Sequence, residues 1–254
     1  MGIKQASDQQ GEDKMEQKKA IIMGASSGMG KELAKILSGN DYIVGLAARR
    51  IDLLNELQKA LPNKSFIKQI DISKPENAEI KFKEMIGEMG GIDLVVISAG
   101  YGDLNSKLKW PIEKATIDVN VTGFALIAGI ALQHFLDQGS GHLVGISSIA
   151  ALRGQRSAPA YSASKAFVCN YLKGLRHIAI KSGKPIFVTD VQPGFVKTPL
   201  SRGNNLFWIS TAEKAASQIY DAIVKKKKHA YITKRWRIVA WLLKIVPDWI
   251  YNKT

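Results

Sequence analysis

Seven short apolar runs, separated by longer amphipathic stretches, constrain the fold of this chain more than any other feature. The runs are Ala20–Met23, Ile43–Ala47, Ser65–Ile70, Leu94–Ile97, His142–Ile146, Ile186–Val191 and Ala230–Ile232. Most are continuous in Val, Ile and Leu and do not alternate with polar residues. Continuous apolar runs of this length indicate strands that are covered on both faces.

Helical patterns lie between the runs. They cover Gly30–Ser38, Asp52–Ala60, Pro75–Glu88, Pro111–Leu136, Ala158–Ser182 and Thr211–Lys226. Repeated strand–helix alternation predicts an α/β protein with a doubly wound parallel sheet of about seven strands, flanked by helices in the Rossmann manner. Ser210-Thr211-Ala212-Glu213 forms a capping box at the start of the last helix. We expect one domain over residues 19–233.

The two ends of the chain differ from this pattern. Residues 1–18 are polar and charged and lack the apolar stretch that a signal peptide contains. We therefore expect them to form a disordered N-terminal segment. We find no apolar run long enough to span a membrane, which predicts a cytoplasmic protein or one peripheral to a membrane. Residues 234–254 form an amphipathic, hydrophobic extension of the same domain.

Cysteine and histidine usage argues against disulfide and metal chemistry. The single cysteine, Cys169, cannot form an internal disulfide and is expected to fill the core. The four histidines are scattered without ligand spacing, so we predict no metal site.

The chain has a net charge of +14, which indicates that it could bind an anionic partner or an anionic surface. Much of the charge lies late, in Lys225-Lys226-Lys227-Lys228 and in the residues that follow. No DNA- or RNA-binding motif accompanies it, so we predict no nucleic-acid binding and favour anionic ligands or an anionic membrane surface.

A glycine-rich segment follows the first predicted strand and opens the first predicted helix. It reads Gly24-Ala25-Ser26-Ser27-Gly28-Met29-Gly30. Glycines allow the backbone to approach a ligand closely, and the amides of a helix N-terminus attract a pyrophosphate. At this place in an α/β chain the segment predicts dinucleotide binding.

The end of the second predicted strand bears on which dinucleotide is bound. Proteins that hold NAD usually place an acidic residue there for the ribose 2′-hydroxyl, whereas an arginine suits a 2′-phosphate. The acidic position is Ala48 in this chain, and Arg49 and Arg50 follow it. We therefore expect NADP(H) to be preferred over NAD(H).

Tyr161 and Lys165 lie one helical turn apart, on one face of a predicted helix. A phenol has an ordinary pKa of about 10, and a neighbouring ammonium favours its ionised form. The pair is therefore a candidate for general acid–base chemistry. Taken alone, the same spacing is common on solvated helices.

The order of these motifs resembles that of the short-chain dehydrogenase/reductase family, over about Lys19 to Thr233. Further fragments fall in register with the family's pattern. They are Asp71-Ile72, Ala99-Gly100, Asn120, Ser148, Pro193-Gly194, Val196 and Thr198. Two positions depart from it: Met23 stands where the family often has threonine, and Ser98 where it often has asparagine.

The resemblance implies the role of each site residue. Tyr161 would protonate a carbonyl oxygen as hydride arrives, and Ser148 would hydrogen-bond that oxygen. Lys165 would lower the tyrosine pKa and bind the nicotinamide ribose, and Asn120 would hold a water of a proton relay. Asp71 and Ile72 would contact the adenine, and residues 193–198 the nicotinamide carboxamide.

Two late segments should decide the substrate. Gly194–Ile209 contains Leu200, Leu206, Phe207 and Trp208 around Gly203-Asn204-Asn205, a candidate mobile lid or an ordinary packed loop. The tail from Arg235 to Tyr251 is rich in Trp, Leu and basic residues. It could lie on an anionic bilayer, cover the substrate pocket or pack in an oligomer interface.

The sequence therefore predicts an NADP(H)-dependent oxidoreductase that interconverts a carbonyl and an alcohol on a small to medium lipophilic substrate. The alternatives are a lipid or sterol oxidoreductase at a membrane surface and a non-catalytic NADP(H)-sensing regulator. By the same resemblance we expect a homodimer or homotetramer.

Overall fold

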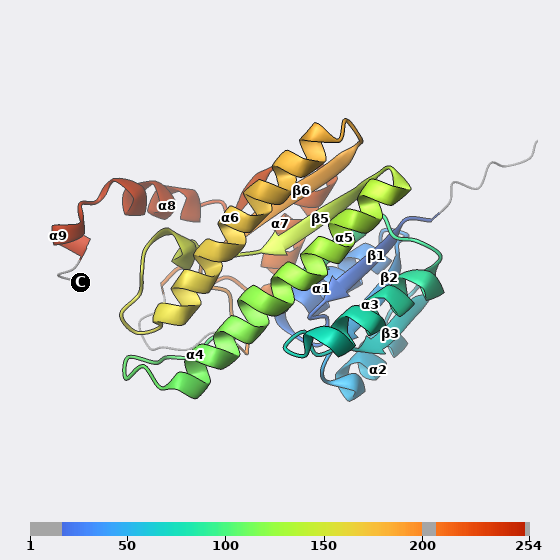
Figure 1. Ribbon diagram of the computed structural model, residues 1–254, viewed down its shortest axis with the longest axis horizontal. Helices are drawn as coiled ribbons and strands as arrows, with labels where there is room; N and C mark the ends of the chain where they lie inside the picture. Colours follow the sequence, from blue (N-terminus) through green and yellow to red (C-terminus); the bar gives the residue numbers. More distant parts are fainter. Residues whose placement is uncertain (1–16, 200–206, 252–254) are drawn as a thin grey trace, which may run out of the picture.

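In the computed structural model, which describes residues 17–199 and 207–251, seven parallel strands form one sheet (Figure 1). The strands are β1 (Lys19–Met23), β2 (Ile43–Ala48), β3 (Ser65–Gln69), β4 (Leu94–Ile97), β5 (Gly141–Ile146), β6 (Ile186–Pro193) and β7 (His229–Ile232). All seven predicted strands are present, with ends that differ by at most two residues. The predicted doubly wound α/β fold is confirmed.

The strand order β3-β2-β1-β4-β5-β6-β7 shows how the sheet is built. The chain starts at β1, adds strands outward to β3, and then returns to β4 on the other side of β1. The connections after β1 and β4 therefore lead to helices on opposite faces of the sheet. Such a reversal opens the crevice in which open α/β sheets bind ligands.

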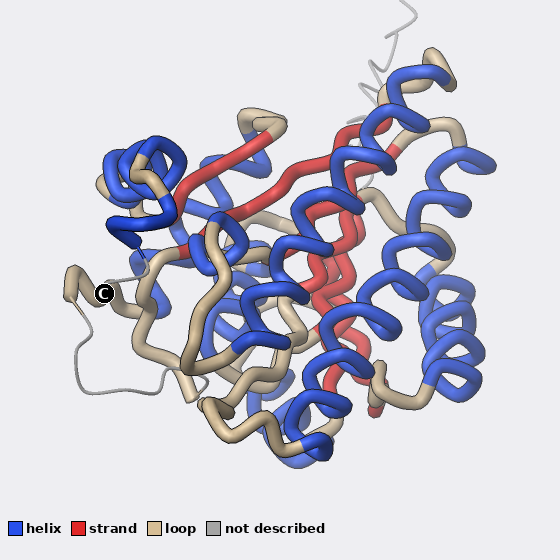
Figure 2. Tube along the Cα trace, turned by 60° about the vertical axis from the view of Figure 1, so that its left-hand side comes forward, coloured by secondary structure: helices blue, strands red, loops and turns tan. Residues whose placement is uncertain are grey.

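Alternate residues of the inner strand β1 face two separate cores, which explains why its apolar run is continuous. Ile21 and Met23 pack with α3, α5 and α6 on one face, and Ala20 and Ile22 with α1, α2 and α7 on the other. Figure 2 shows the strands enclosed between helices. The bounds are α1 (Gly28–Ser38), α2 (Ile51–Lys59), α3 (Pro75–Met89), α5 (Phe124–Gln138), α6 (Pro159–Lys181) and α7 (Ala212–Val224).

The helix predicted over Pro111–Leu136 is interrupted. It consists of α4 (Trp110–Ile117), a π-helical turn η1 (Asp118–Gly123) and α5. Gly123 lies against the carbonyl of Ile72, and a Cβ there would overlap it. A π turn inside a helix often marks a functional site, and this one contains Asn120.

The same stretch corrects the expectation that no segment is long and apolar enough to span a membrane. Trp110–Gln138 is 29 residues long with a mean hydropathy of 1.7 over its most apolar window. Its side chains Phe124, Ile127 and Phe135 are buried in the core on the sheet. Packing against the sheet accounts for its apolar character.

The start of α7 differs by one residue from the capping-box prediction. Thr211, not Ser210, caps the helix, and its hydroxyl accepts a hydrogen bond of 3.2 Å from the Lys214 amide. After β7 the chain continues into α8 (Trp236–Ile245) and the short α9 (Asp248–Tyr251), and Pro247 lies between them, as its inability to continue a helix requires.

Candidate active site

A cleft crosses the carboxyl ends of the central strands and consists of two joined hollows. One is lined by the glycine-rich segment and by residues after β2, β3 and β4. The other is lined by residues after β4, β5 and β6 and by the start of α6. Met29, Ser98, Gly100, Gly102 and Thr198 line both. A ligand in the first hollow therefore reaches the second without leaving the cleft.

The glycine-rich segment turns tightly between β1 and α1. Gly24 has φ +93°, and a Cβ at this residue would overlap the main chain of Ala99. The amides of Ser98 and Ala99 in turn donate to the Met23 carbonyl, at 2.8 Å each. The loops after β1 and β4 are thus pressed together, and the N-terminus of α1 opens onto the first hollow as an anion site requires.

Arg50 connects the end of β2 to this segment. Its guanidinium donates to the hydroxyls of Ser26, at 3.1 Å, and Ser27, at 2.8 Å. Ala48 is buried beneath it, while Arg49 and Arg50 are exposed and both line the first hollow. The structure thus presents two cations, and no carboxylate at position 48, where a nucleotide ribose would lie.

Most of the predicted cofactor residues meet in the cleft. Gly24, Ser26, Ser27, Gly28, Met29, Arg49, Arg50, Asp71, Ile72, Ala99, Gly100 and Thr198 line the first hollow. Pro193, Gly194 and Val196 line the second, while Gly30 packs beneath, against the Gly24 carbonyl. The Asp71 carboxylate accepts from the Ser73 amide at 3.0 Å and hydroxyl at 2.8 Å, and so stabilises its own turn.

Tyr161, Ser148 and Lys165 line the second hollow, beside Gly100 and Gly102, which line both hollows. Ser148 lies just after β5, where it caps a short 3-10 turn, and it hydrogen-bonds the Tyr161 phenol. The Lys165 ammonium lies 5.7 Å from the Tyr161 ring centroid and donates to the Ile146 carbonyl at 3.0 Å. Ser148 comes from the segment after β5, and Tyr161 and Lys165 come from α6, which packs against the 3-10 turn that follows Ser148.

Burial has the largest effect on the pKa values of Tyr161 and Lys165. Burial raises the pKa of Tyr161, against the opposing effect of the Ser148 hydrogen bond. Burial also lowers the pKa of Lys165 to about 8. Desolvation disfavours both charged forms, and the expectation that Lys165 lowers the tyrosine pKa stays a prediction.

Asn120 holds the loop after β4 against α6. Its amide donates to the Tyr101 carbonyl at 2.7 Å and to the Ser164 hydroxyl at 2.9 Å, and its oxygen accepts from the Tyr101 amide at 2.8 Å. Asn120 thus fixes the position of Tyr101 relative to α6. A relay water between Asn120 and Lys165 stays a prediction.

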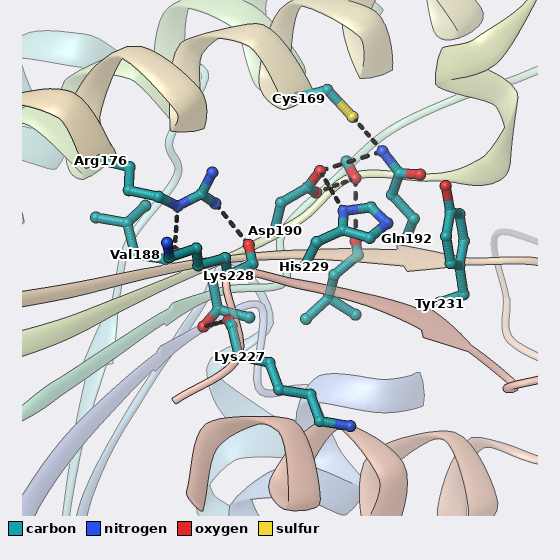
Figure 3. Close-up of polar contacts among 12 residues, drawn as sticks. Cys169, Arg176, Val188, Asp190, Gln192, Lys227, Lys228, His229 and Tyr231 are labelled. Atoms are coloured by element: carbon teal, nitrogen blue, oxygen red, sulfur yellow. Dashed lines mark hydrogen bonds and ion pairs between the residues drawn. The ribbon is translucent and has the colours of Figure 1, made fainter. Parts of the chain in front are cut away.

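A buried carboxylate, Asp190 on β6, supports the site from below and was not singled out by sequence reasoning. Figure 3 shows Asp190 with His229, Gln192 and Cys169 around it. The hydroxyl of Ser147 donates to Asp190, and Gln192 and His229 contact it at 3.1 and 3.2 Å. The sequence did hold a signal for this network, because Asp190 is the charged residue of the predicted strand Ile186–Val191. A carboxylate buried in a strand needs hydrogen-bonding partners.

The Asp190 network bears on catalysis because Ser147 stands between Ile146 and Ser148. Ile146 accepts from Lys165, and Ser148 contacts Tyr161, so the carboxylate fixes the backbone that positions both. Burial acts to raise the pKa of Asp190, but hydrogen bonds from His229 and Ser147 outweigh it and hold the pKa below its ordinary value. Burial raises the pKa of Cys169 to about 11, so its thiol stays neutral.

We expect Asp190→Asn to lower the free energy of unfolding by about 1–3 kcal/mol, because charge-assisted hydrogen bonds to Ser147 and His229 are lost. Urea denaturation measures the change. The exposed Asp221→Asn serves as the control and should stay within about 0.5 kcal/mol of the wild type. Equal stability of the two variants would contradict this role.

The second hollow has a largely apolar wall. Leu104, Ile149, Ala150, Ala158 and Phe195 line it, together with Asp103 and Gln155. Behind Phe195 lies Trp236 of α8, whose buried indole also fills the space in front of Gly194, where a Cβ would overlap it.

Part of the candidate lid joins this wall. Phe207 and Trp208 contact Trp236, with ring centroids 5.1 and 6.3 Å apart. Leu200, Gly203, Asn204, Asn205 and Leu206 lie outside the described residues, so a lid stays a prediction.

The chain resembles known proteins over most of its length. Residues 18–206 match the family model described as short chain dehydrogenase. An uncharacterized oxidoreductase of Myxococcus xanthus is 36% identical over 245 residues, which cover 94% of this chain and 96% of the relative. One of Mycobacterium tuberculosis is 36% identical over 192 residues, 72% of this chain and 75% of the relative.

Solved structures share the fold at lower identity. ElxO with NADP bound aligns with a TM-score of 0.74 and 23% identity, over 85% of this chain and 96% of that one. A short chain dehydrogenase/reductase of Burkholderia phymatum in complex with NAD aligns with a TM-score of 0.80 and 19% identity, over 89% and 92%.

Proposed function

Because the chain belongs to the short-chain dehydrogenase/reductase family, we propose that it interconverts a carbonyl and an alcohol on a small to medium lipophilic substrate, with NADP(H) as cofactor. The observation that carries the proposal is the convergence of Tyr161, Ser148 and Lys165 in the second hollow, next to the first hollow that the glycine-rich segment lines. In this family the substrate class varies, so the apolar lining of the second hollow supports the lipophilic assignment.

The residues present fit a dinucleotide. Gly24 leaves room for close approach, the N-terminus of α1 faces the first hollow, and Arg50 adds a cation held by Ser26 and Ser27. When bound, the reduced nicotinamide supplies the hydride. The glycine-rich segment would hold the pyrophosphate, and Arg50 with Arg49 the 2′-phosphate.

The chain's own residues supply the proton and the orientation. In reduction, Tyr161 gives its phenolic proton to the carbonyl oxygen, and in oxidation its phenolate removes the proton of the alcohol. Ser148 hydrogen-bonds the same oxygen and sets its distance from the phenol. Lys165, buried and bonded to the Ile146 carbonyl, places a positive charge beside the phenolate that reduction leaves.

The proposed activity is tested by following NADPH oxidation with lipophilic ketones and aldehydes. We expect turnover with at least one apolar carbonyl compound and little with small hydrophilic sugars. Cofactor binding without turnover of any carbonyl would favour the non-catalytic NADP(H)-sensing alternative.

The cofactor preference rests on Arg50. Arg50→Ala should weaken NADPH binding about 10- to 100-fold, as expected for the loss of a hydrogen bond between charged groups, and leave NADH binding nearly unchanged. Arg49→Ala, its exposed neighbour, is the matched variant and should have the smaller effect. Fluorescence titration with both nucleotides measures this. Equal weakening of both nucleotides would mean that Arg50 only orders the glycine-rich segment.

We further propose a homo-oligomer that forms through the outer faces of α5 and α6. Among the apolar residues of these two helices, Phe124, Ile127, Phe135 and Leu172 are core residues, whereas Ile130 and Phe167 are only partly buried. Phe167 stacks on Tyr171 at 5.3 Å on this face. A strictly monomeric mass by light scattering would rule this out.

A further inference from the structure

Helix α8 presents two different apolar faces. Its inner face buries Trp236 and Ala240 against Ile149 and Phe195. Its outer face exposes Ile238 (60%), Trp241 (60%), Leu242 (45%) and Ile245 (55%), and α9 adds Trp249 and Ile250. We refer to these six exposed residues as the outer strip. Figure 1 shows α8 and α9 projecting at one end of the molecule.

The outer strip is held in place by the body of the protein. Arg153, at the end of the short 3-10 turn η2 (Ile149–Leu152), donates to the Leu243 carbonyl at 2.7 Å, to the Val246 carbonyl and to the Asp248 carboxylate. The Tyr251 hydroxyl donates to the Gly154 carbonyl at 3.0 Å. The C-terminal end of α8 is thus capped, so its outer face does not depend on a partner for its shape.

Most charges around the outer strip are positive, and the carboxylate next to it, Asp248, is paired with Arg153. Residues 222–247 contain eight lysines and arginines and no aspartate or glutamate. Lys225, Lys227, Lys234 and Arg237 line one hollow beside the start of α8, where Asp221 is the one carboxylate among the lining residues. Arg237 and Lys244 continue the basic surface along the flank of α8 itself.

We propose that the outer strip docks on the surface of an anionic phospholipid bilayer, with the basic hollow and flank meeting its phosphates. Exposed Trp, Ile and Leu on one helix face, bordered by Lys and Arg, have the chemistry of a helix that lies in the headgroup region. The α8–α9 segment is too short to span the bilayer.

A second copy of this chain fits the same surface less well. In a two-fold symmetric dimer the same patch meets itself, so Arg237 and Lys244 of one copy would approach those of the other. Positions 222–247 hold no acidic residue to neutralise them, and Asp248 of α9 is already paired with Arg153. Charge complementarity therefore favours an anionic lipid surface.

The orientation of the docked protein indicates a class of substrate, and this step rests on the proposed function. Trp236 on the inner face packs against Gly194 and Phe195, which line the substrate hollow. The wall of the hollow and the bilayer would then lie on opposite sides of one helix. A lipophilic carbonyl compound dissolved in the membrane is the substrate class that this arrangement favours.

Co-sedimentation of the full chain with vesicles tests the docking without any need for turnover. We expect binding to vesicles of phosphatidylcholine mixed with phosphatidylglycerol, weak binding to phosphatidylcholine alone, and a loss of binding at high salt. Trp241→Glu with Ile245→Glu should weaken binding more than about tenfold, because both introduced carboxylates are repelled by the surface. Lys225→Gln with Arg237→Gln should weaken it about fivefold for each charge removed.

Ile80→Glu is the matched control, since Ile80 is 58% exposed on α3 and lies outside the outer strip. It should bind like the wild type. The proposal is overturned if the wild type ignores anionic vesicles, or if the Trp241→Glu and Ile245→Glu variant binds as well as Ile80→Glu. It is also overturned if light scattering shows that the outer-strip variant converts an oligomer into a monomer, because a second copy would then occupy the face.

Discussion

Replacement of Tyr161 by phenylalanine is expected to reduce turnover by about 10²- to 10⁴-fold, the usual contribution of a positioned general acid or base. The phenol hydrogen-bonds Ser148 and lines the second hollow, where a substrate carbonyl would lie. Phenylalanine keeps the ring that packs against Gly102, so the loop after β4 should stay in place.

Steady-state kinetics with NADPH and an active carbonyl compound measures the loss, and fluorescence titration shows that NADPH still binds. Tyr171→Phe is the control, since that tyrosine lies on the same helix but stacks on Phe167 away from the cleft. Wild-type turnover in Tyr161→Phe would remove this residue from the mechanism.

Acidification should destabilise the protein through His142. This side chain is 7% exposed at the start of β5 and contacts the Thr189 hydroxyl at 2.8 Å. Burial, with a smaller effect of Lys226, lowers its pKa to about 4, below the ordinary 6.5. Between these values the unfolded chain binds a proton that the folded chain does not, so stability is lost as the pH falls.

The expected loss is about 1.4 kcal/mol per pH unit as the pH falls below about 6.5, and about 3 kcal/mol in all by pH 4. Urea denaturation at several pH values measures it. In His142→Gln the slope should decrease by that amount above about pH 5, where few carboxylates titrate. An unchanged slope would show that another group carries the proton uptake.

The sheet and its covering helices could be predicted because each element is specified locally. Runs such as Leu94–Ile97 are fully buried on both faces, and each predicted helix carries at least one apolar face. The glycine-rich segment and the Tyr161–Lys165 pair were equally visible, since their chemistry lies in short spacings. The cleft that joins them follows from the strand order.

Features that depend on distant partners could not be predicted. The π turn around Asn120 arises where Gly123 meets Ile72, fifty residues away in the chain, and has no compositional signature. Asp190 is stabilised by side chains from β7 and from the segment after β5, which only the fold brings together. The direction in which the Tyr161 pKa is shifted depends on how deeply the ring is buried, and the spacing of residues in the sequence does not reveal that depth.

The contact between Gly194 and Trp236 predicts covariation between two positions that are far apart in the sequence. Because the indole occupies the volume that any Cβ at position 194 would need, only glycine is compatible with a tryptophan at position 236. Relatives with alanine or serine in place of Gly194 should therefore carry a smaller residue in place of Trp236, or lack the helix altogether. Chimeras that exchange C-terminal segments between relatives should fold only when both positions are exchanged together.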